Sequence, residues 1–112
     1  MNDGGVLYEL DLASGRVQWN EQLYKTYGYD KSEPVNSMEW WADHIHPDDA
    51  MLLNQTMDKL MDPSVTEWAV EYRMQKGDKT YVLVRDNATV LRDEDGRAVR
   101  LTGSLTPVVT PA

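Results

Sequence analysis

A chain of 112 residues is long enough for one domain with its own hydrophobic core and too short for two. Its net charge of −8, with 11 Lys and Arg residues scattered along it, argues against nucleic-acid binding, which needs clustered cations. The apolar runs are too short for a membrane span or a signal-peptide core. Because cysteine is absent, the sequence excludes disulfides, thiolate metal sites, cysteine nucleophiles and cysteinyl–flavin photochemistry.

The first predicted elements are two strands joined by a turn. Residues 6–12 alternate apolar and polar side chains, which places Val6, Tyr8 and Leu10 on one face. Residues 13–15 form a turn in which Gly15 can take a positive φ, and residues 16–19 continue the alternation. The pattern predicts a β-hairpin.

Two short helices are expected next. Asn20 suits a helix N-cap and Gly28 suits the end of that helix. Residues 29–37 are polar and predict a loop, after which residues 37–45 predict a brief helix rich in bulky side chains. Trp40 and Trp41 are adjacent and cannot face the same way, so we expect one of them to lie nearer the core.

A longer helix is predicted to begin at Pro47 and to end at Asp62. Asp48 and Asp49 fall in its first turn, where the helix dipole favours negative charge. Apolar side chains then recur at a spacing of three and four residues, which indicates one buried face: Ala50, Leu53, Met57, Leu60 and Met61.

The remainder of the chain changes to the two-residue period of strands. Residues 66–74, 81–91 and 97–105 predict three strands, joined by turns at 76–79 and 93–96. In the last strand we expect Val99, Leu101 and Leu105 to face inward, with Gly103 allowing a close approach or a bulge. Strands and helices segregated in this order predict an α+β fold, an antiparallel sheet with helices over one face.

Five motifs in this order resemble the PAS sensory domain family. They are VQWNEQLYKTYGYD (17–30), HPDD (46–49), EWAVEYRM (67–74), DEDGR (93–97) and GSL (103–105). The branch that they resemble is common in bacterial sensor histidine kinases and cyclic-dinucleotide enzymes. The resemblance covers nearly the whole chain and implies a five-stranded antiparallel sheet with short helices and one longer helix packed on one face. It divides the chain into a lead-in (1–5), one PAS domain (6–106) and a tail (107–112).

The sequence departs from the family pattern at its end. The D-I-T-like triplet that leads into a signalling helix is replaced by residues 106–109, and Pro107 and Pro111 disfavour a helix there. Either the chain was cut at this point or a signal leaves by another route.

Residues 44–49 are also similar to the H-x-H-x-D-H zinc motif of metallo-β-lactamase-type hydrolases. Asp49 stands where the last His of that motif belongs, and the chain has no third histidine. The alternative is a helix start, with His46 held extended before Pro47. We favour the helix start and reject His44 and His46 as metal ligands. The cofactor is unknown, and haem or flavin is possible but not indicated. Against haem, the haem-binding relatives usually take their histidine from the longer helix, which has none here.

The resemblance places a ligand pocket between the sheet and the helices. The candidate lining residues are Tyr24, Trp40, Trp41, Met57, Met61, Trp68, Tyr72 and Val84. A filled core remains an alternative, since the methionines at 51, 57, 61 and 74 can serve simply as core. Glu71 and Arg73 share the outward face of their strand and could form an ion pair or an interface contact.

No catalytic carboxylate pair, nucleophile turn or phosphate loop is recognisable, so we expect a non-catalytic module. The resemblance implies a homodimer in which a small ligand, a cofactor or a neighbouring domain shifts the helices against the sheet. The shift would control an attached output domain, a histidine kinase or a nucleotide cyclase. The expected location is the cytoplasm, or the cytoplasmic part of a membrane-anchored sensor. The alternatives are a structural dimerisation spacer and, remotely, a metal-dependent hydrolase.

Overall fold

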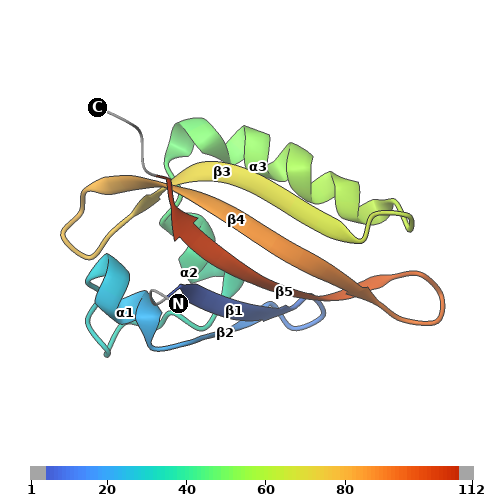
Figure 1. The fold of residues 1–112 in the computed structure, drawn as a ribbon, viewed down its shortest axis with the longest axis horizontal. Helices are drawn as coiled ribbons and strands as arrows, with labels where there is room; N and C mark the ends of the chain where they lie inside the picture. The colour runs from blue at the N-terminus through green and yellow to red at the C-terminus, as the bar shows by residue number, and fades with distance from the viewer. Residues whose placement is uncertain (1–4, 109–112) are drawn as a thin grey trace.

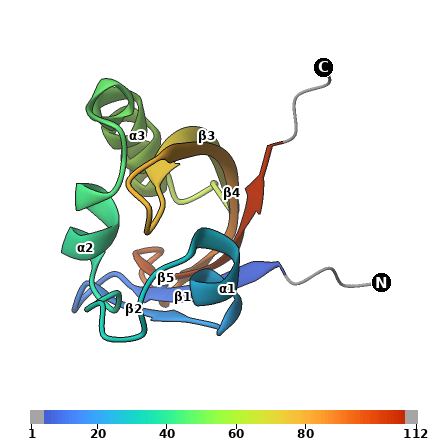
Figure 2. The ribbon, with the colours of Figure 1, turned by 90° about the vertical axis from the view of Figure 1, so that its left-hand side faces the viewer.

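Five antiparallel strands curve around helices in the computed structural model, which describes residues 5–108 (Figure 1). The strand order is β2-β1-β5-β4-β3, and α2 and α3 lie against one side of the curved sheet (Figure 2). The strands are β1 (Val6–Asp11), β2 (Arg16–Trp19), β3 (Glu67–Gln75), β4 (Tyr81–Arg92) and β5 (Ala98–Pro107). The helices are α1 (Gln22–Tyr27), α2 (Met38–Asp43), η1 (Pro47–Asp49), α3 (Ala50–Met57) and η2 (Asp58–Met61). The predicted fold class and element order are confirmed.

The strands that lead to the two ends of the chain are neighbours in the sheet. β1 and β5 pair antiparallel, with Val6 opposite Leu105 and Tyr8 opposite Gly103. β5 extends to Pro107, two residues past the predicted strand end at 105, and Pro107 pairs with Val84 on β4. Pro111 lies outside the described residues. A displacement of β5 therefore acts directly on the start of β1, to which it is hydrogen-bonded.

The last strand corrects one expectation. Val99 is 37% exposed rather than inward, whereas Leu101 and Leu105 are fully buried. The pairing of β4 with β5 shifts register between Leu91 and Arg92, opposite Ala98. A bulge of this kind breaks the strict alternation of side chains, so Ala98 packs against the core in place of Val99.

The first helix ends as predicted and begins differently. Gly28 closes α1 with a φ of 75°, and its N–H donates to the carbonyl of Tyr24. The N-cap is Glu21 rather than Asn20. The Asn20 amide instead bridges to the start of the chain, accepting from the Leu7 N–H at 3.1 Å and donating to the Gly5 carbonyl at 3.1 Å. This side chain therefore ties the helix to β1.

Both tryptophans of α2 are buried to the same extent, so the expectation that one lies nearer the core is wrong. Trp40 stacks on His44 with ring centroids 4.1 Å apart and also contacts Tyr29. Trp41 faces the opposite way and meets Tyr72 of β3. Because α2 has the loop after α1 on one side and the sheet on the other, opposite faces of this helix are both covered.

The long helical segment spans residues 47–61 and changes pitch at each end. Leu53, Thr56 and Leu60 face the core, whereas Met61 is 84% exposed. In a 3₁₀ turn side chains three residues apart align, so Leu60 follows Met57 and Met61 rotates away into solvent. The prediction that Met61 lies on the buried face is wrong. Met51 is exposed as well, and of the four methionines considered as a row only Met57 and Met74 contribute to the core.

Candidate functional site

A small cavity lies between the inner face of the sheet and helices α2 and α3. Its volume is about 20 Å³, which is room for about one water-sized group. Four aromatic rings, two methionines, three aliphatic side chains and one carboxyl group surround it: Tyr8, Leu10, Val17, Trp19, Met38, Trp41, Met57, Trp68, Asp86 and Leu101. The cavity is therefore apolar and aromatic, with one ionisable acid at its wall.

The structure brings three of the proposed pocket residues to this cavity: Trp41, Met57 and Trp68. Tyr72 does not line the cavity itself but packs against the ring of Trp41, which does. Val84 is fully buried in β4. Trp40 faces away toward His44. Tyr24 is partly buried against the core with the Lys31 ammonium over its ring, and Met61 points into solvent; neither lines the cavity.

Asp86 is the polar centre of the site and was missed by sequence reasoning. It is 1% exposed on β4, where Val84, Ala88 and Val90 share its inward parity. That parity is the signal that could have found it, because an acid in register with apolar neighbours on a half-buried strand must face the core. A carboxyl group there has to be hydrogen-bonded, since burying it alone is costly.

Two strands supply the hydrogen bonds that hold this carboxyl group, and α2 supports one of the two donors. The Tyr8 hydroxyl of β1 donates to Oδ1 at 2.6 Å, and the Tyr72 hydroxyl of β3 donates to Oδ2 at 2.9 Å. The Trp41 indole N–H of α2 donates in turn to the Tyr72 oxygen at 2.9 Å. Helix α2 is therefore linked through Tyr72 and Asp86 to Tyr8 on β1, two strands away from β4 in the sheet.

Gly103 makes room for this arrangement. A Cβ atom at this position would lie 2.4 Å from the Asn87 carbonyl oxygen and 2.7 Å from the Tyr8 hydroxyl. Only a residue without a side chain lets the Tyr8 ring cross β5 and reach β4. The expectation that Gly103 allows a close approach is confirmed.

Burial dominates the proton affinity of the network. It raises the pKa of Asp86 to about 7, against the opposing effect of the hydrogen bonds from Tyr8 and Tyr72. Burial and the nearby Asp86 charge also raise the pKa of Tyr8 and of Tyr72 well above the ordinary tyrosine range. The two hydroxyls therefore stay protonated and act as donors at neutral pH, while Asp86 sits near its midpoint.

The two histidines do not face a common centre. His44 Nδ1 lies 2.7 Å from the Trp40 carbonyl, and the ring stacks on Trp40. His46 Nδ1 accepts the Asp48 N–H at 3.1 Å, and its ring lies 4.8 Å from that of Tyr81. Within residues 5–108, no three His, Asp or Glu side chains are grouped so that they could hold a metal ion.

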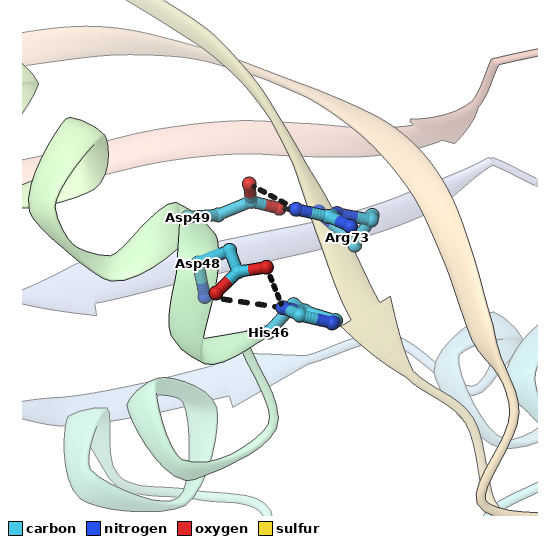
Figure 3. A network of polar contacts seen from close by, with 4 residues as sticks. All are labelled: His46, Asp48, Asp49 and Arg73. Carbon is cyan, nitrogen blue, oxygen red and sulfur yellow. Dashed lines mark hydrogen bonds and ion pairs between the residues drawn. The ribbon is translucent and has the colours of Figure 1, made fainter.

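Asp49 has a structural partner that the sequence analysis did not foresee. Figure 3 shows it facing Arg73 of β3 while Asp48 lies beside His46. Its Oδ2 accepts from the Arg73 backbone N–H at 2.8 Å and from Nε at 3.0 Å, and its Oδ1 accepts from Nη2 at 2.9 Å. These hydrogen bonds hold the pKa of Asp49 below its usual range.

Glu71 pairs with Arg85 rather than with Arg73, the partner suggested by the sequence. Its carboxylate lies 3.3 Å from Arg85, the residue directly opposite it on β4. Directly opposite residues of antiparallel strands are closer than residues two apart on one strand, which explains the choice of partner. Arg73 is left to anchor the start of the long helical segment.

The α+β architecture, with five antiparallel strands and helices over one side, is that of a PAS-like domain. The family described as the PAS fold matches residues 16–105, and the chain belongs to this family.

Solved structures with the same fold come from signalling proteins. The N-terminal domain of a diguanylate cyclase with a PAS/PAC sensor from Marinobacter aquaeolei superposes with a TM-score of 0.80 at 22% identity, covering 92% of this chain and 94% of that one. A sensory box histidine kinase/response regulator from Burkholderia thailandensis gives a TM-score of 0.78 at 20% identity, covering 94% of this chain and 77% of that one. At such identities the likeness shows the fold.

No curated protein sequence matches the chain. Among the described residues, no helix is both long enough and apolar enough to span a membrane.

Proposed function

We propose that this PAS domain is the sensory module of a bacterial signal-transduction protein. It is itself non-catalytic and relays the state of its core to an attached output domain, a histidine kinase or a cyclic-dinucleotide cyclase. The solved relatives, which include parts of a diguanylate cyclase and a histidine kinase, support this class of output. Its proposed setting is the cytoplasm or the cytoplasmic part of a membrane-anchored sensor.

The observation that carries the proposal is the path from the cavity to both ends of the chain. Asp86 pairs across the sheet with Leu105 of β5 and binds the hydroxyl of Tyr8 on β1. These are the strands that lead to the two ends of the chain, and they pair with each other. A change of charge or occupancy at Asp86 therefore acts on the two segments through which a neighbouring domain would be joined.

The test is amide hydrogen exchange in a variant that cuts the path. Tyr72→Phe leaves the Trp41 N–H without its acceptor and removes one donor from Asp86. We expect exchange to accelerate by about tenfold in α2, β1 and β5, because an unmet buried hydrogen bond lowers the cost of local opening.

Tyr81→Phe is the matched control for this experiment. Tyr81 is exposed at the start of β4, and its ring contacts His46 rather than the network. Its exchange pattern should equal that of the wild type. Acceleration confined to β3 and α2 in Tyr72→Phe, with β1 and β5 unchanged, would show that the network does not reach the chain ends and would refute the proposal.

A second function, a structural dimerisation spacer, is favoured by one observation. The cavity of about 20 Å³ is far smaller than the roughly 300–1,000 Å³ of sites for drug-sized ligands. Native mass spectrometry of the purified protein separates the two functions, because both expect a homodimer but a spacer carries no small molecule. The sensory proposal instead expects a bound small ligand or a change in thermal stability when one is added.

A further inference from the structure

When Asp86 is ionised, the side chains that line the cavity offer acceptors but no available donor. The Tyr8 hydroxyl donates to Asp86, and the Trp41 N–H donates to Tyr72. The other two indoles that line the cavity are engaged elsewhere, Trp19 with the Val35 carbonyl at 2.7 Å and Trp68 with the Thr56 carbonyl at 3.0 Å. What remains for a ligand is the lone pairs of the Asp86 carboxylate, the faces of aromatic rings and two thioethers.

This chemistry selects against most ligand classes. Above the pKa of Asp86, an anion is repelled by the carboxylate, and a neutral acceptor such as a carbonyl finds no free N–H or O–H among the side chains that line the cavity. A cation with N–H groups fits, because it donates to the carboxylate and is attracted to the π-faces of the surrounding rings. The overall charge of −8 also favours the approach of cations.

The size and the boundary of the cavity narrow the choice further. A volume of about 20 Å³ admits one water-sized group, which is the size of an ammonium head. Trp19, Met38 and Met57 are the partly exposed members of the lining, at the end of β2, the start of α2 and the end of α3. Since methionine side chains adapt their shape at low cost, Met38 and Met57 can make room for a short alkyl tail.

We propose that this cavity binds a small monocation, an ammonium or short primary alkylammonium ion, with its N–H groups directed at Asp86 and its alkyl part among Trp19, Met38 and Met57. The proposal rests on the proposed sensory function, because it names the chemical class of the signal. Binding at Asp86 replaces a proton by the ligand's charge, and this exchange is what Tyr8 and Tyr72 would pass on to β1 and α2.

The proposal requires a particular pH dependence. The titratable side chains near Asp86 are tyrosines from three elements, Tyr8 of β1, Tyr72 of β3 and Tyr27 of α1, and burial raises the pKa of all three. They stay neutral below pH 9, so Asp86 alone sets the profile. Only its ionised form binds the cation. With a pKa of about 7 for Asp86, the apparent affinity should fall about tenfold from pH 8 to pH 6.

The test follows the four indole N–H resonances of ¹⁵N-labelled protein during titration with methylammonium chloride at pH 8, against sodium chloride at equal ionic strength. We expect saturable shifts for Trp19, Trp41 and Trp68, and smaller ones for Trp40, which lies outside the cavity. Tetramethylammonium, which is larger and has no N–H donor, should bind at least about tenfold more weakly, and methanol should cause no saturable shift. Equal shifts with sodium chloride, or none that saturate, would overturn the proposal and leave the cavity as a site for water alone.

Two variants test whether the negative charge that binds the cation is the charge of Asp86. Asp86→Asn keeps the shape of the side chain and should weaken binding at least about tenfold, because the charge-assisted hydrogen bond is lost. Glu71→Gln removes one negative charge from the outer face of β3 and should bind as the wild type does. If Asp86→Asn fails to fold, the pH profile of the wild type decides, since affinity independent of pH between 6 and 8 contradicts a role for Asp86.

The outcomes also separate this inference from the proposed function. Absence of cation binding together with altered exchange at the chain ends in Tyr72→Phe refutes the ligand and leaves the relay standing. Cation binding without altered exchange supports the ligand and refutes the relay.

Discussion

Asp86 occupies a strand position that the alternation of β4 would otherwise give to an apolar side chain. Its carboxyl group is satisfied by two tyrosine hydroxyls rather than by a counter-charge. When the Asp86 carboxyl group is ionised, it lowers the stability of the folded state, because hydrogen bonds from neutral donors only partly replace those from water. A buried acid without a cationic partner is therefore more easily explained by a role in sensing than by a role in folding.

Asp86 should make the protein less stable as the pH rises. The folded pKa of about 7 lies above the value of about 3.9 expected in the unfolded chain. The folded state therefore holds a proton between these values that the unfolded state has lost. The stabilisation is complete below about pH 4 and is lost as the pH rises through 7. From pH 5 to pH 8 we expect this group to lower the free energy of unfolding by about 2 to 3 kcal/mol.

Urea unfolding of wild type and Asp86→Asn at pH 5, 6, 7 and 8 measures this contribution as a difference. The asparagine can still accept from one tyrosine and donate to the other, but it does not titrate. The stability of the variant relative to the wild type should increase with pH. Glu71→Gln should follow the wild type. A difference between Asp86→Asn and wild type that stays constant over this range would contradict the pKa assigned to Asp86.

At the scale of elements, the long helical segment is fastened to the sheet at both ends. Asp49 at its start is held by Arg73 of β3. At its end the Arg92 guanidinium of β4 donates to the carbonyls of Leu60 at 3.1 Å and Asp62 at 2.8 Å. These two anchors fix where α3 lies over the cavity, so they set how far the segment can move when the core changes.

The anchor at the start of the segment gives a prediction with a close control. Asp49→Ala should lower the urea midpoint of unfolding at pH 7 more than Asp48→Ala, since the Asp49 carboxylate is hydrogen-bonded to Arg73 whereas that of Asp48 lies 3.9 Å from His46 Nδ1. Because the pKa of Asp49 is lowered in the folded state, its stabilising effect is present above about pH 4 and is lost as the pH falls further. Equal losses in the two variants at pH 7 would show that the contact with Arg73 stabilises no more than the helix dipole does.

Local patterns predicted the elements because their causes are local. The alternation of residues 67–74, the turn at Gly15, the helix end at Gly28 and the start at Pro47 all depend on neighbours in the chain. The errors came where a distant group decided the outcome. Asn20 left its expected capping role to bridge Leu7 and Gly5, and Val99 turned outward because it is the extra residue of a bulge in β5.

The candidate site was predicted only in part for the same reason. Aromatic and methionine residues in the helices and β3 indicate a packed interior, and Trp41, Met57 and Trp68 are at the cavity. Sequence spacing cannot show that Tyr8 reaches Asp86 across 78 positions, or that Gly103 is what lets it pass. Asp86 itself was predictable from strand parity alone, and its partners were not.

At the scale of the whole molecule, the outer face of the sheet remains partly apolar. Leu7 on β1 and Leu91 on β4 point away from the helices, and both are about half exposed. Polar side chains such as Asn87, Thr89 and Thr102 lie among them. A face of this composition suits an interface that is polar at its edge and apolar in places, so we place the proposed homodimer contact here.

The proposed homodimer gives the last prediction. Leu7→Arg combined with Leu91→Arg should convert a dimer to a monomer in sedimentation velocity, because like charges then meet across a two-fold axis. The control adds the same charge elsewhere, through Met51→Arg with Met61→Arg on the exposed side of the long helical segment. That variant should sediment as the wild type does. Loss of the dimer in both variants would indicate a nonspecific effect of charge, and its persistence in the first would place the contact on another surface.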